Sequence, residues 1–212
     1  MELLEGIRTL QGCPASIPDC SREDLPKLFK QLGFKVGVEI GVFRGMFTEI
    51  LAKSGLRIYG VDPWRVYKNY GNLKDQKRYE KLYEEAMRRV APYPNVTIIR
   101  KTSMEAVDDF KDGSIDFVYI DGNHRFRYIA EDIYEWAFKV KDGGIICGHD
   151  YAPFKRRYLN CGCQVKEIID AFVESYDIEN FWALCRRRGG EPRDSFRSWL
   201  IIKDNRWVKL RE

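Results

Sequence analysis

The sequence predicts an α/β fold in which a parallel sheet is covered by helices on both faces. Short apolar, β-branched runs alternate along the chain with longer segments whose apolar residues recur every three or four positions. Strands that are buried on both faces are continuous apolar runs, and the helices that connect them produce this alternation. No Pro-, Gly- or Ser-rich linker divides the 212 residues, so we expect one compact domain.

Seven apolar runs are expected to form the strands, over residues 36–40, 58–61, 96–100, 115–120, 144–147, 181–185 and 198–202. Helical spacing of apolar residues predicts helices over 75–90, 126–140 and 165–176. The first 33 residues contain three prolines and are expected to be an irregular lead-in, with one helix near 25–32. The domain itself is expected to span residues 34–212.

The composition argues against secretion, membrane spanning and nucleic-acid binding. The first residues lack a basic segment followed by an apolar one, and no run of about 18 apolar residues occurs. The 36 Lys and Arg nearly balance the 32 Asp and Glu, so the net charge of +4 indicates no nucleic-acid role. The six cysteines do not form two close couples at zinc-site spacing. We therefore expect reduced thiols in a cytoplasmic protein.

Both histidines of the chain, His124 and His149, closely follow expected strands. Asp121 comes directly after the run 115–120, and Asp150 follows His149. The carboxyl ends of parallel strands share one edge of the sheet, where open α/β folds bind their ligands. Carboxylates and imidazoles at that edge indicate an enzyme. The competing interpretation is that each histidine only caps a loop by bonding backbone groups.

The first expected strand leads through Glu39, Gly41 and Gly45 into a helix. Glycines at such a turn let a ligand approach the backbone, and the amino end of the helix offers unpaired N–H groups. Asp62 follows the second expected strand, 23 residues after Glu39, where a carboxylate can accept both hydroxyls of a ribose. The spacing differs from G-x-G-x-x-G, and Asp62 before Pro63 can also be an ordinary loop residue.

Three segments together resemble a class I S-adenosylmethionine-dependent methyltransferase: VEIGVFRG, YGVDPW and FVYIDGNHRFRYIAEDIYEWAFKVKDGGIICGHDY. Within that superfamily the chain is similar to the group of sugar and macrolide O-methyltransferases and cephalosporin-hydroxylase-like proteins. The resemblance covers residues ~34 to ~202. It implies a Rossmann-like sheet of seven strands in the order 3-2-1-4-5-7-6, with the last strand antiparallel.

The resemblance also implies where S-adenosylmethionine binds. Gly41 and Gly45 would frame the methionine part of the cofactor, and Glu39 would hold the shape of the loop or meet the cofactor indirectly. Asp62 would bind the ribose.

Further cofactor contacts are implied after the later strands. Ser103 and Met104 occupy the place where such enzymes meet the adenine ring, and Asp121 would lie beside the methyl donor. Trp64 would add an apolar wall, although a Trp after a strand also serves to cover a sheet edge.

Methyl transfer to a hydroxyl requires an in-line approach and removal of the hydroxyl proton. Two solutions are open. In the first, Asp121, His149 and Asp150 hold a divalent cation, Mg²⁺ or Mn²⁺, as the similarity to catechol and macrolide O-methyltransferases implies; an imidazole ligand favours Mn, Fe or Zn over Mg. In the second, His124 is the general base, with Asp121 or Asp150 orienting its ring, and His149 could serve instead.

The leading hypothesis is therefore an S-adenosylmethionine-dependent O-methyltransferase with a small-molecule acceptor, such as a sugar or natural product. An NAD-dependent oxidoreductase is the alternative among enzymes, but the third turn glycine of a dinucleotide site is missing. An RNA-binding or RNA-modifying protein is the alternative from another class, and no basic stripe supports it. Residues 64–74 and 151–164 are expected to select the acceptor, and their aromatic side chains leave a homo-oligomer contact open.

Overall fold

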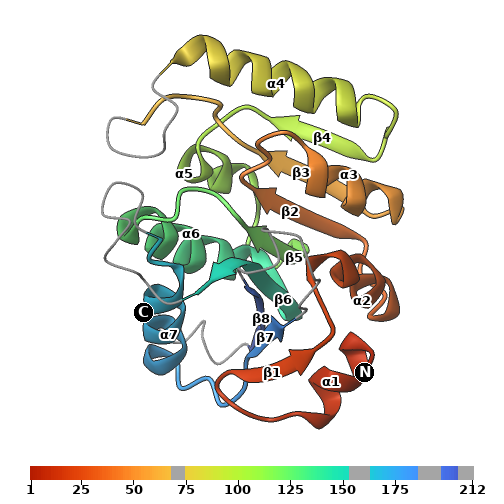
Figure 1. The fold of residues 1–212 in the computed structure, drawn as a ribbon, viewed down its shortest axis with the longest axis vertical. Helices are drawn as coiled ribbons and strands as arrows, with labels where there is room; N and C mark the ends of the chain where they lie inside the picture. The colour runs from red at the N-terminus through yellow and green to blue at the C-terminus, as the bar shows by residue number, and fades with distance from the viewer. Residues whose placement is uncertain (68–74, 153–162, 186–196, 205–212) are drawn as a thin grey trace.

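A sheet runs through the centre of the molecule with helices on both of its faces (Figure 1). The structure is a computed structural model and describes residues 1–67, 75–152, 163–185 and 197–204. Within these residues the sheet has eight strands, in the order β1-β7-β8-β6-β5-β2-β3-β4. The strands are β1 (Ala15–Pro18), β2 (Val36–Ile40), β3 (Arg57–Val61), β4 (Val96–Ile99), β5 (Ile115–Ile120), β6 (Val140–Tyr151), β7 (Trp182–Cys185) and β8 (Arg197–Ile202).

The topology confirms the order that the family resemblance implies. The seven expected strands are β2 to β8, and their order across the sheet is the expected 3-2-1-4-5-7-6. Strand β8 is antiparallel to both β6 and β7, and the other neighbours are parallel. Strand β6 is longer than expected, because its pairing with β5 continues past an irregular step from residue 140 into the run at 145–148.

The N-terminal segment is less irregular than expected, because β1 adds an eighth strand at the edge of the sheet. It pairs in parallel with β7, from Ala15 beside Trp182 to Pro18 beside Cys185. Its side chains alternate between buried and exposed, and Pro18 is tolerated because an edge strand has one unpaired side. Four residues ending in proline are too short a run to be recognised as a strand from the sequence.

Helices pack against both faces of the sheet. The helical elements are α1 (Leu3–Thr9), η1 (Arg22–Asp24), α2 (Leu25–Gln31), α3 (Met46–Lys53), α4 (Gln76–Val90), α5 (Ser103–Ala106), η2 (Val107–Asp109), α6 (Phe126–Lys139) and α7 (Val165–Ser175). The expected helices correspond to α2, α4, α6 and α7, with ends that differ by one residue at most. This small difference is ordinary for helix ends, where the last turn frays.

Strand β5 shows how the two faces of the sheet are divided. Phe117 and Tyr119 pack into a core with side chains of α1, α2 and α3, whereas Val118 and Ile120 pack into a second core with α6 and α7. Successive side chains of a strand point to opposite faces, so a run of apolar residues is needed to fill both cores. Residues 1–33 contribute to the first core through Leu3 and other apolar side chains, so the N-terminal segment packs onto the sheet.

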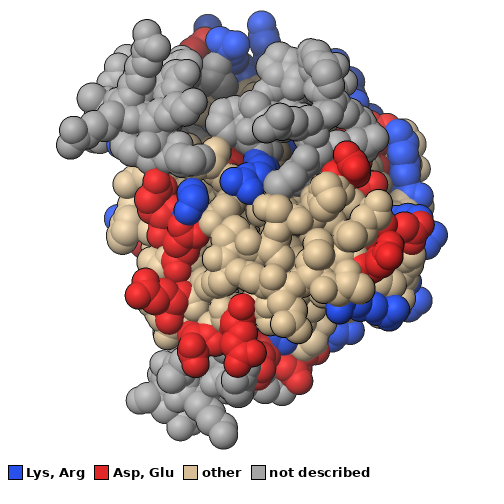
Figure 2. Space-filling view, turned by 60° about the horizontal axis from the view of Figure 1, so that its bottom comes forward, with Lys and Arg blue, Asp and Glu red and all other residues tan. Residues whose placement is uncertain are grey.

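The surface near β1 and α1 has few basic side chains. Figure 2 turns the lower part of Figure 1 forward and shows a broad uncharged area bordered by Asp and Glu, without a continuous stripe of Lys and Arg over its described residues. None of the described helices is long and apolar enough to cross a membrane. Cys13, Cys20, Cys147 and Cys163 form no disulfide bond in the described part of the chain.

Candidate active site

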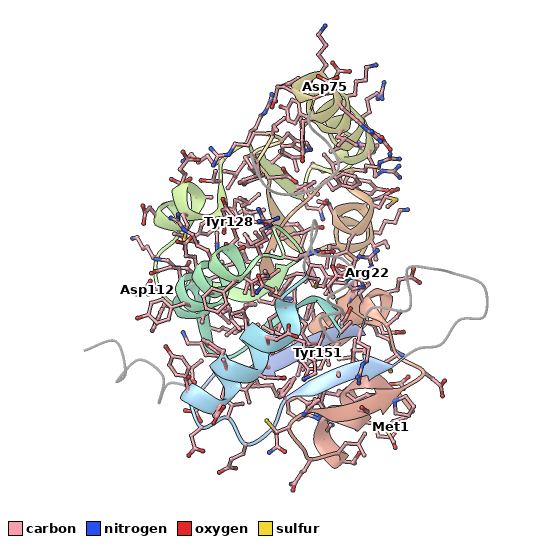
Figure 3. The ribbon with its side chains drawn as sticks, turned by 60° about the vertical axis from the view of Figure 1, so that its left-hand side comes forward. Met1, Arg22, Asp75, Asp112, Tyr128 and Tyr151 are labelled. Carbon is pink, nitrogen blue, oxygen red and sulfur yellow. The ribbon has the colours of Figure 1, made fainter. Side chains whose placement is uncertain are left out.

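A cavity of about 820 Å³ opens at the carboxyl edge of the sheet. Loops after β2, β3, β4 and β5 line it, together with the last part of β6, α6 and the N-terminal segment. Figure 3 shows two contributors from outside these loops, Arg22 on the N-terminal segment and Tyr128 on α6. The cavity is therefore located where open α/β sheets bind ligands, as the positions of the two histidines predict.

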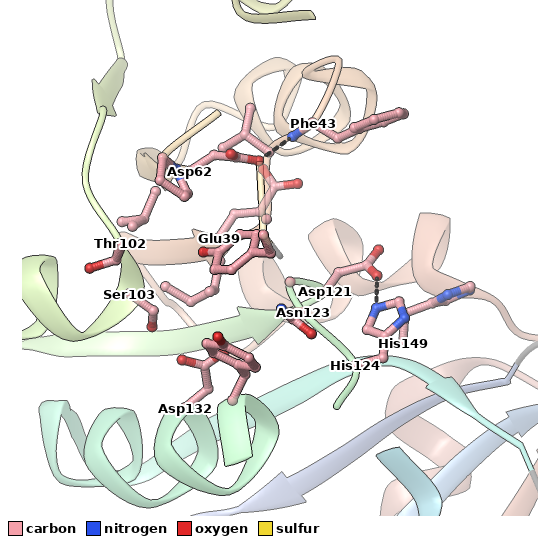
Figure 4. A pocket seen from close by; sticks show the side chains of 18 of the residues that line it. Glu39, Phe43, Asp62, Thr102, Ser103, Asp121, Asn123, His124, Asp132 and His149 are labelled. Carbon is pink, nitrogen blue, oxygen red and sulfur yellow. Dashed lines mark hydrogen bonds and ion pairs between the residues drawn. The ribbon is translucent and has the colours of Figure 1, made fainter. Parts of the chain in front are cut away.

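The order of the strands determines the order of the side chains along the cavity. Each of five neighbouring strands, in the order β4-β3-β2-β5-β6, brings one residue to the cavity. These residues are Ser103 after β4, Asp62 after β3, Gly41 after β2, Asp121 after β5 and Asp150 near the end of β6. Figure 4 shows the same sequence of side chains across the cavity, from Ser103 at one end to Asp121 at the other. A ligand that spans the cavity meets a different set of side chains at each end.

Gly41 allows the loops after β2 and β5 to touch. Its φ is +93°, and a Cβ atom at this position would lie 2.2 Å from the carbonyl oxygen of Asp121. Gly45, with a φ of +72°, is the N-cap of α3, so glycine is favoured at both positions. Both glycines that the sequence predicts for the cofactor turn are therefore required by the backbone itself.

Glu39 is buried beneath this turn, with 2% of its surface exposed, and lines the cavity. Its Oε2 atom has no hydrogen-bond partner among the described residues. Burial raises the pKa of its carboxyl group to about 8. A buried carboxyl group without a partner costs free energy, so this atom is arranged to meet a polar ligand.

Asp62 joins the two loops on which the cofactor site depends. Its Oδ2 atom accepts the backbone N–H of Phe43 at 2.9 Å, and its Oδ1 atom accepts that of Trp64 at 2.8 Å. Burial raises the pKa of Asp62, although these two N–H groups counteract the rise. Each carboxylate oxygen has a second lone pair, so Asp62 keeps acceptor capacity toward the cavity.

Trp64 lies behind the cavity wall and does not line it, in contrast to the expected apolar wall. The indole is 1% exposed, donates its Nε1–H to the carbonyl of Phe43 at 2.8 Å and packs edge-on against Tyr83 with ring centroids 5.0 Å apart. Its φ of +42° is unusual for a bulky residue. Trp64 thus fixes the loop, as a tryptophan that covers a sheet edge does.

Ser103 and Met104 both line the cavity at the end of β4, as predicted. Thr102 caps α5 by accepting the N–H of Glu105, whose carboxylate accepts the N–H of Thr102 in return. The hydroxyl oxygen of Ser103 accepts the indole N–H of Trp136 at 2.7 Å. The short helix α5 is therefore held firmly against α6.

Asp132, on α6, lies opposite Ser103 and was not predicted. It is 4% exposed, and burial raises the pKa of its carboxyl group to about 7. Its position lies between Ile129 and Trp136 on the buried stripe of the helix. A carboxylate at a position that the apolar spacing assigns to the core is the sequence signal that could have identified it.

The end of the cavity beside β5 and β6 brings together Asp121, His124 and Asp150. His124 Nε2 lies 3.3 Å from Asp121 Oδ1 and 3.2 Å from Asp150 Oδ2. One potential ligand atom from each of the three residues falls within 4.8 Å of the other two. The geometry of these described residues therefore groups His124 with the two carboxylates, where the sequence predicted His149.

His149 lines the same cavity but contacts only one of the carboxylates, with Nδ1 at 3.4 Å from Asp150 Oδ1. Asp150 has a φ of +60°, and His149, the residue before it, lies outside the group of three. Burial alone would lower the pKa of His124, but the hydrogen bond to Asp121 and the charge of Asp150 raise it above its usual value.

Arg22 is a site residue that the sequence did not reveal. It begins η1, lines the cavity, and places Nη1 3.4 Å from Asp121 Oδ2 and its guanidinium 5.5 Å from the centre of the Phe47 ring. A capping box between Ser21 and Asp24 fixes this turn. Arg22 is one of 36 Lys and Arg in the chain and precedes the predicted domain, so no local pattern singled it out.

Tyr67 and Tyr128 close part of the cavity on its outer side. Their rings meet edge-on with centroids 5.4 Å apart, and both line the cavity. Residues 68–74 and 153–162, which belong to the two segments expected to select the acceptor, lie outside the described residues.

Comparison with known proteins identifies the family. A family model described as a methyltransferase domain matches residues 38–151, more than half of the 212 residues. A curated relative, the uncharacterized protein y4gI of Sinorhizobium fredii (strain NBRC 101917 / NGR234), is 28% identical over 120 residues. That match covers 53% of this chain and only 13% of the relative, so the chain spans a small part of that protein.

Solved structures share the fold. The O-methyltransferase from Bacillus cereus, in complex with SAH, has a TM-score of 0.59 at 16% identity and covers 86% of this chain and 80% of its own. TomG from Streptomyces achromogenes, an O-methyltransferase in complex with SAM, has a TM-score of 0.58 at 13% identity, with 86% and 79% covered. A putative rRNA-methylase from Clostridium thermocellum has a TM-score of 0.58 at 16% identity, with 87% and 96% covered. The chain thus belongs to the methyltransferase-domain family and has the fold of class I S-adenosylmethionine-dependent methyltransferases.

Proposed function

We propose that the chain transfers the methyl group of S-adenosylmethionine to a hydroxyl group of a small molecule. The observation that carries this proposal is the convergence of Asp121, His124 and Asp150 within 4.8 Å at one end of a cavity whose other end has the cofactor residues. The cavity volume of about 820 Å³ is near the upper end of the range of roughly 300–1,000 Å³ for small-molecule sites, which supports two ligands side by side.

The residues of the glycine turn fit the cofactor. Gly41 and Gly45 leave the backbone open to a ligand, and the unpartnered Oε2 of Glu39 suits a molecule with an amino group and a sulfonium. Asp62 would accept the ribose hydroxyls with its remaining lone pairs. When bound, S-adenosylmethionine supplies an electrophilic methyl group next to a positively charged sulfur.

Asp121, His124 and Asp150 fit a divalent cation. Two carboxylates and one imidazole form a donor set that suits Mn²⁺ or Zn²⁺ better than Mg²⁺. A cation held there would supply Lewis acidity, which lowers the pKa of a nearby hydroxyl. Because methyl transfer to oxygen needs the loss of a proton, this cluster explains why the proposed acceptor is a hydroxyl.

A mechanism without metal would use the same three residues. His124 would accept the proton, and Asp121 and Asp150 would orient its ring. The two carboxylates raise the pKa of His124, which keeps the imidazole protonated to a higher pH and weakens it as a base at neutral pH. We therefore favour the cation, with His124 as its neutral ligand and His149 beside it, bonded to Asp150.

Two other activities are weaker candidates. The family match speaks against an NAD-dependent oxidoreductase. An RNA substrate has support from two of the structural neighbours, which are described as rRNA methylases, but identities of 14% and 16% show a shared fold alone.

Transfer of a labelled methyl group tests the proposal. The purified chain would be incubated with methyl-labelled S-adenosylmethionine, Mn²⁺ and either the small-molecule fraction or the total RNA of a cell extract. The proposal predicts label in the small-molecule fraction, in a product stable to the mild base that cleaves methyl esters. Label in RNA alone, or in a base-labile product alone, would refute it.

A further inference from the structure

We propose that Asp132 determines specificity for the cofactor because its carboxyl group forms a pair of hydrogen bonds with the edge of the adenine ring. This inference rests on the proposed function, because it assigns the adenine to the cavity end at β4. It adds a residue in the middle of α6 to a set of proposed cofactor contacts that otherwise lie at the ends of strands or in the loops after them.

Asp132 faces the cavity although its helix position belongs to the buried stripe. It is 4% exposed, lines the cavity and points toward it from α6, across from Thr102 and Ser103 (Figure 4). Tyr128, one turn earlier on the same face of α6, also lines the cavity. A carboxyl group that only filled space here would be replaced at lower cost by an apolar side chain, since burial of an ionised carboxylate is expensive.

A directed chain of hydrogen bonds orients the carboxyl group. The indole N–H of Trp136 can only donate, so the hydroxyl oxygen of Ser103 accepts it, at 2.7 Å. The proton of that hydroxyl is then available to Asp132, whose carboxyl group hydrogen-bonds with Ser103. Ser103 donates to one carboxyl oxygen, and the plane of the group is thereby fixed before any ligand arrives.

An oriented carboxyl group of this kind fits a planar ring that has a hydrogen-bond donor next to a hydrogen-bond acceptor on one edge. Adenine has this arrangement, with its exocyclic amino group next to a ring nitrogen. A protonated carboxyl group has the complementary arrangement, one acceptor and one O–H donor. Burial raises the pKa of Asp132 to about 7, which supports the protonated form, and Glu131 adds to the rise.

The location agrees with this assignment. Ser103 follows β4, with β3 and β2 between it and the Asp121 cluster beside β5, and Asp132 reaches Ser103 from α6. The Oδ2 atom of Asp132 also lies 3.7 Å from the position of a Cβ on Gly122, so this carboxyl group borders the middle of the cavity as well. Asp62 lies next along the edge, where it would hold the ribose that joins adenine to the rest of the cofactor. The order adenine, ribose, methionine and acceptor therefore follows the order of the strands.

Binding of two ligands to three proteins tests the inference. S-adenosylhomocysteine and its 6-deamino analogue, which has purine in place of adenine, would be titrated calorimetrically into wild type, Asp132→Leu and Asp132→Asn. Wild type should prefer S-adenosylhomocysteine roughly tenfold or more, because the analogue leaves an acceptor of Asp132 unpaired. Asp132→Leu should reduce that preference to about twofold or less.

Asp132→Asn separates recognition from a purely structural role. An amide also presents one acceptor and one donor to adenine, so this variant should keep most of the preference. Asp108→Asn, at an exposed position on η2, is the control for loss of a carboxylate. A preference unchanged in Asp132→Leu, or lost equally in both Asp132 variants, would overturn the inference alone, whereas a wild-type chain that binds neither ligand would overturn the proposed function as well.

Discussion

His124 places Nε2 3.2 Å from Oδ2 of Asp150, and the same atom lies 3.3 Å from Asp121. Two carboxylates at the ends of adjacent strands repel each other unless positive charge lies between them. Asp121 and Asp150 raise the pKa of His124, which favours its imidazolium form, and Arg22 adds a second positive charge beside Asp121. A divalent cation that binds all three residues would displace the imidazole proton, so metal binding should release protons.

Metal removal should abolish the proposed transfer. We expect a chelator to stop labelled methyl transfer, and Mn²⁺ to restore it at least as well as Mg²⁺, because an imidazole belongs to the donor set. Asp150→Asn should bind Mn²⁺ at least tenfold more weakly in a calorimetric titration, since it loses a charged ligand. Full activity in the presence of chelator would contradict the role of a metal ion, and the mechanism in which His124 is the general base would remain.

Gly41→Ala should destabilise the chain far more than Gly55→Ala. Both glycines have positive φ, +93° and +83°, so both substitutions bring backbone strain of roughly 1–2 kcal/mol. Only at Gly41 does the new Cβ meet other atoms, with the Asp121 carbonyl oxygen at 2.2 Å, whereas nothing lies within 4 Å at Gly55. Urea denaturation should therefore give a clearly larger loss for Gly41→Ala. Equal losses would show that the contact between these loops is unimportant for the fold.

Asp62→Ala should weaken binding of S-adenosylhomocysteine by about 10- to 100-fold, since each lost bond to a charged acceptor costs roughly 1.5–3 kcal/mol. Asp116→Ala is the matched control, because Asp116 also accepts two backbone N–H groups, those of Lys35 and Val36, at the opposite edge of the sheet. Both variants should lose stability in urea, and only Asp62→Ala should lose affinity. The ribose assignment would be wrong if both bound the ligand as wild type does.

The stability of the chain should fall as pH rises from about 4 to about 7, in part because of Asp132. The folded state holds the carboxyl proton up to about pH 7, whereas the unfolded carboxyl group loses it near its ordinary pKa of 3.8. The folded state then binds more protons in this window, so the free energy of unfolding decreases by at most roughly 1.4 kcal/mol per pH unit.

Asp132→Asn removes this contribution, whereas Glu39, whose pKa is raised to about 8, continues to act in the same direction. Urea titrations at pH 5 and pH 7.5 should show a smaller stability difference for the variant than for wild type. The same difference in both proteins would mean that Asp132 is ionised in the folded state throughout.

The arrangement of the sheet could be predicted because apolar runs and helical spacing are local signals. Strand β5 needs apolar residues on both faces, and its sequence shows them without interruption from Phe117 to Ile120. The residues at strand ends, Asp62 and Asp121, were found because the edge of a parallel sheet collects them. The strand order came from the family resemblance.

What could not be predicted depends on contacts between distant segments. Arg22 reaches Asp121 across 99 positions of the chain, from a turn whose proline-rich surroundings indicated an irregular segment. The sequence did not distinguish His124 from His149 as the third member of the group, because only the folded loops bring His124 Nε2 near both Asp121 and Asp150. The roles of Asp132 and Trp64 depend on which residues bury their side chains, and only the folded structure determines this.

The most direct test of the central claim is a calorimetric titration of S-adenosylhomocysteine into the wild-type chain, with NAD titrated in parallel. We predict one site per chain, saturable binding of S-adenosylhomocysteine and no heat from NAD, because in the proposed function the glycine turn and Asp62 hold a single nucleoside. Binding of NAD without binding of S-adenosylhomocysteine, or of neither ligand, would contradict the proposal that this cavity holds the methyl donor.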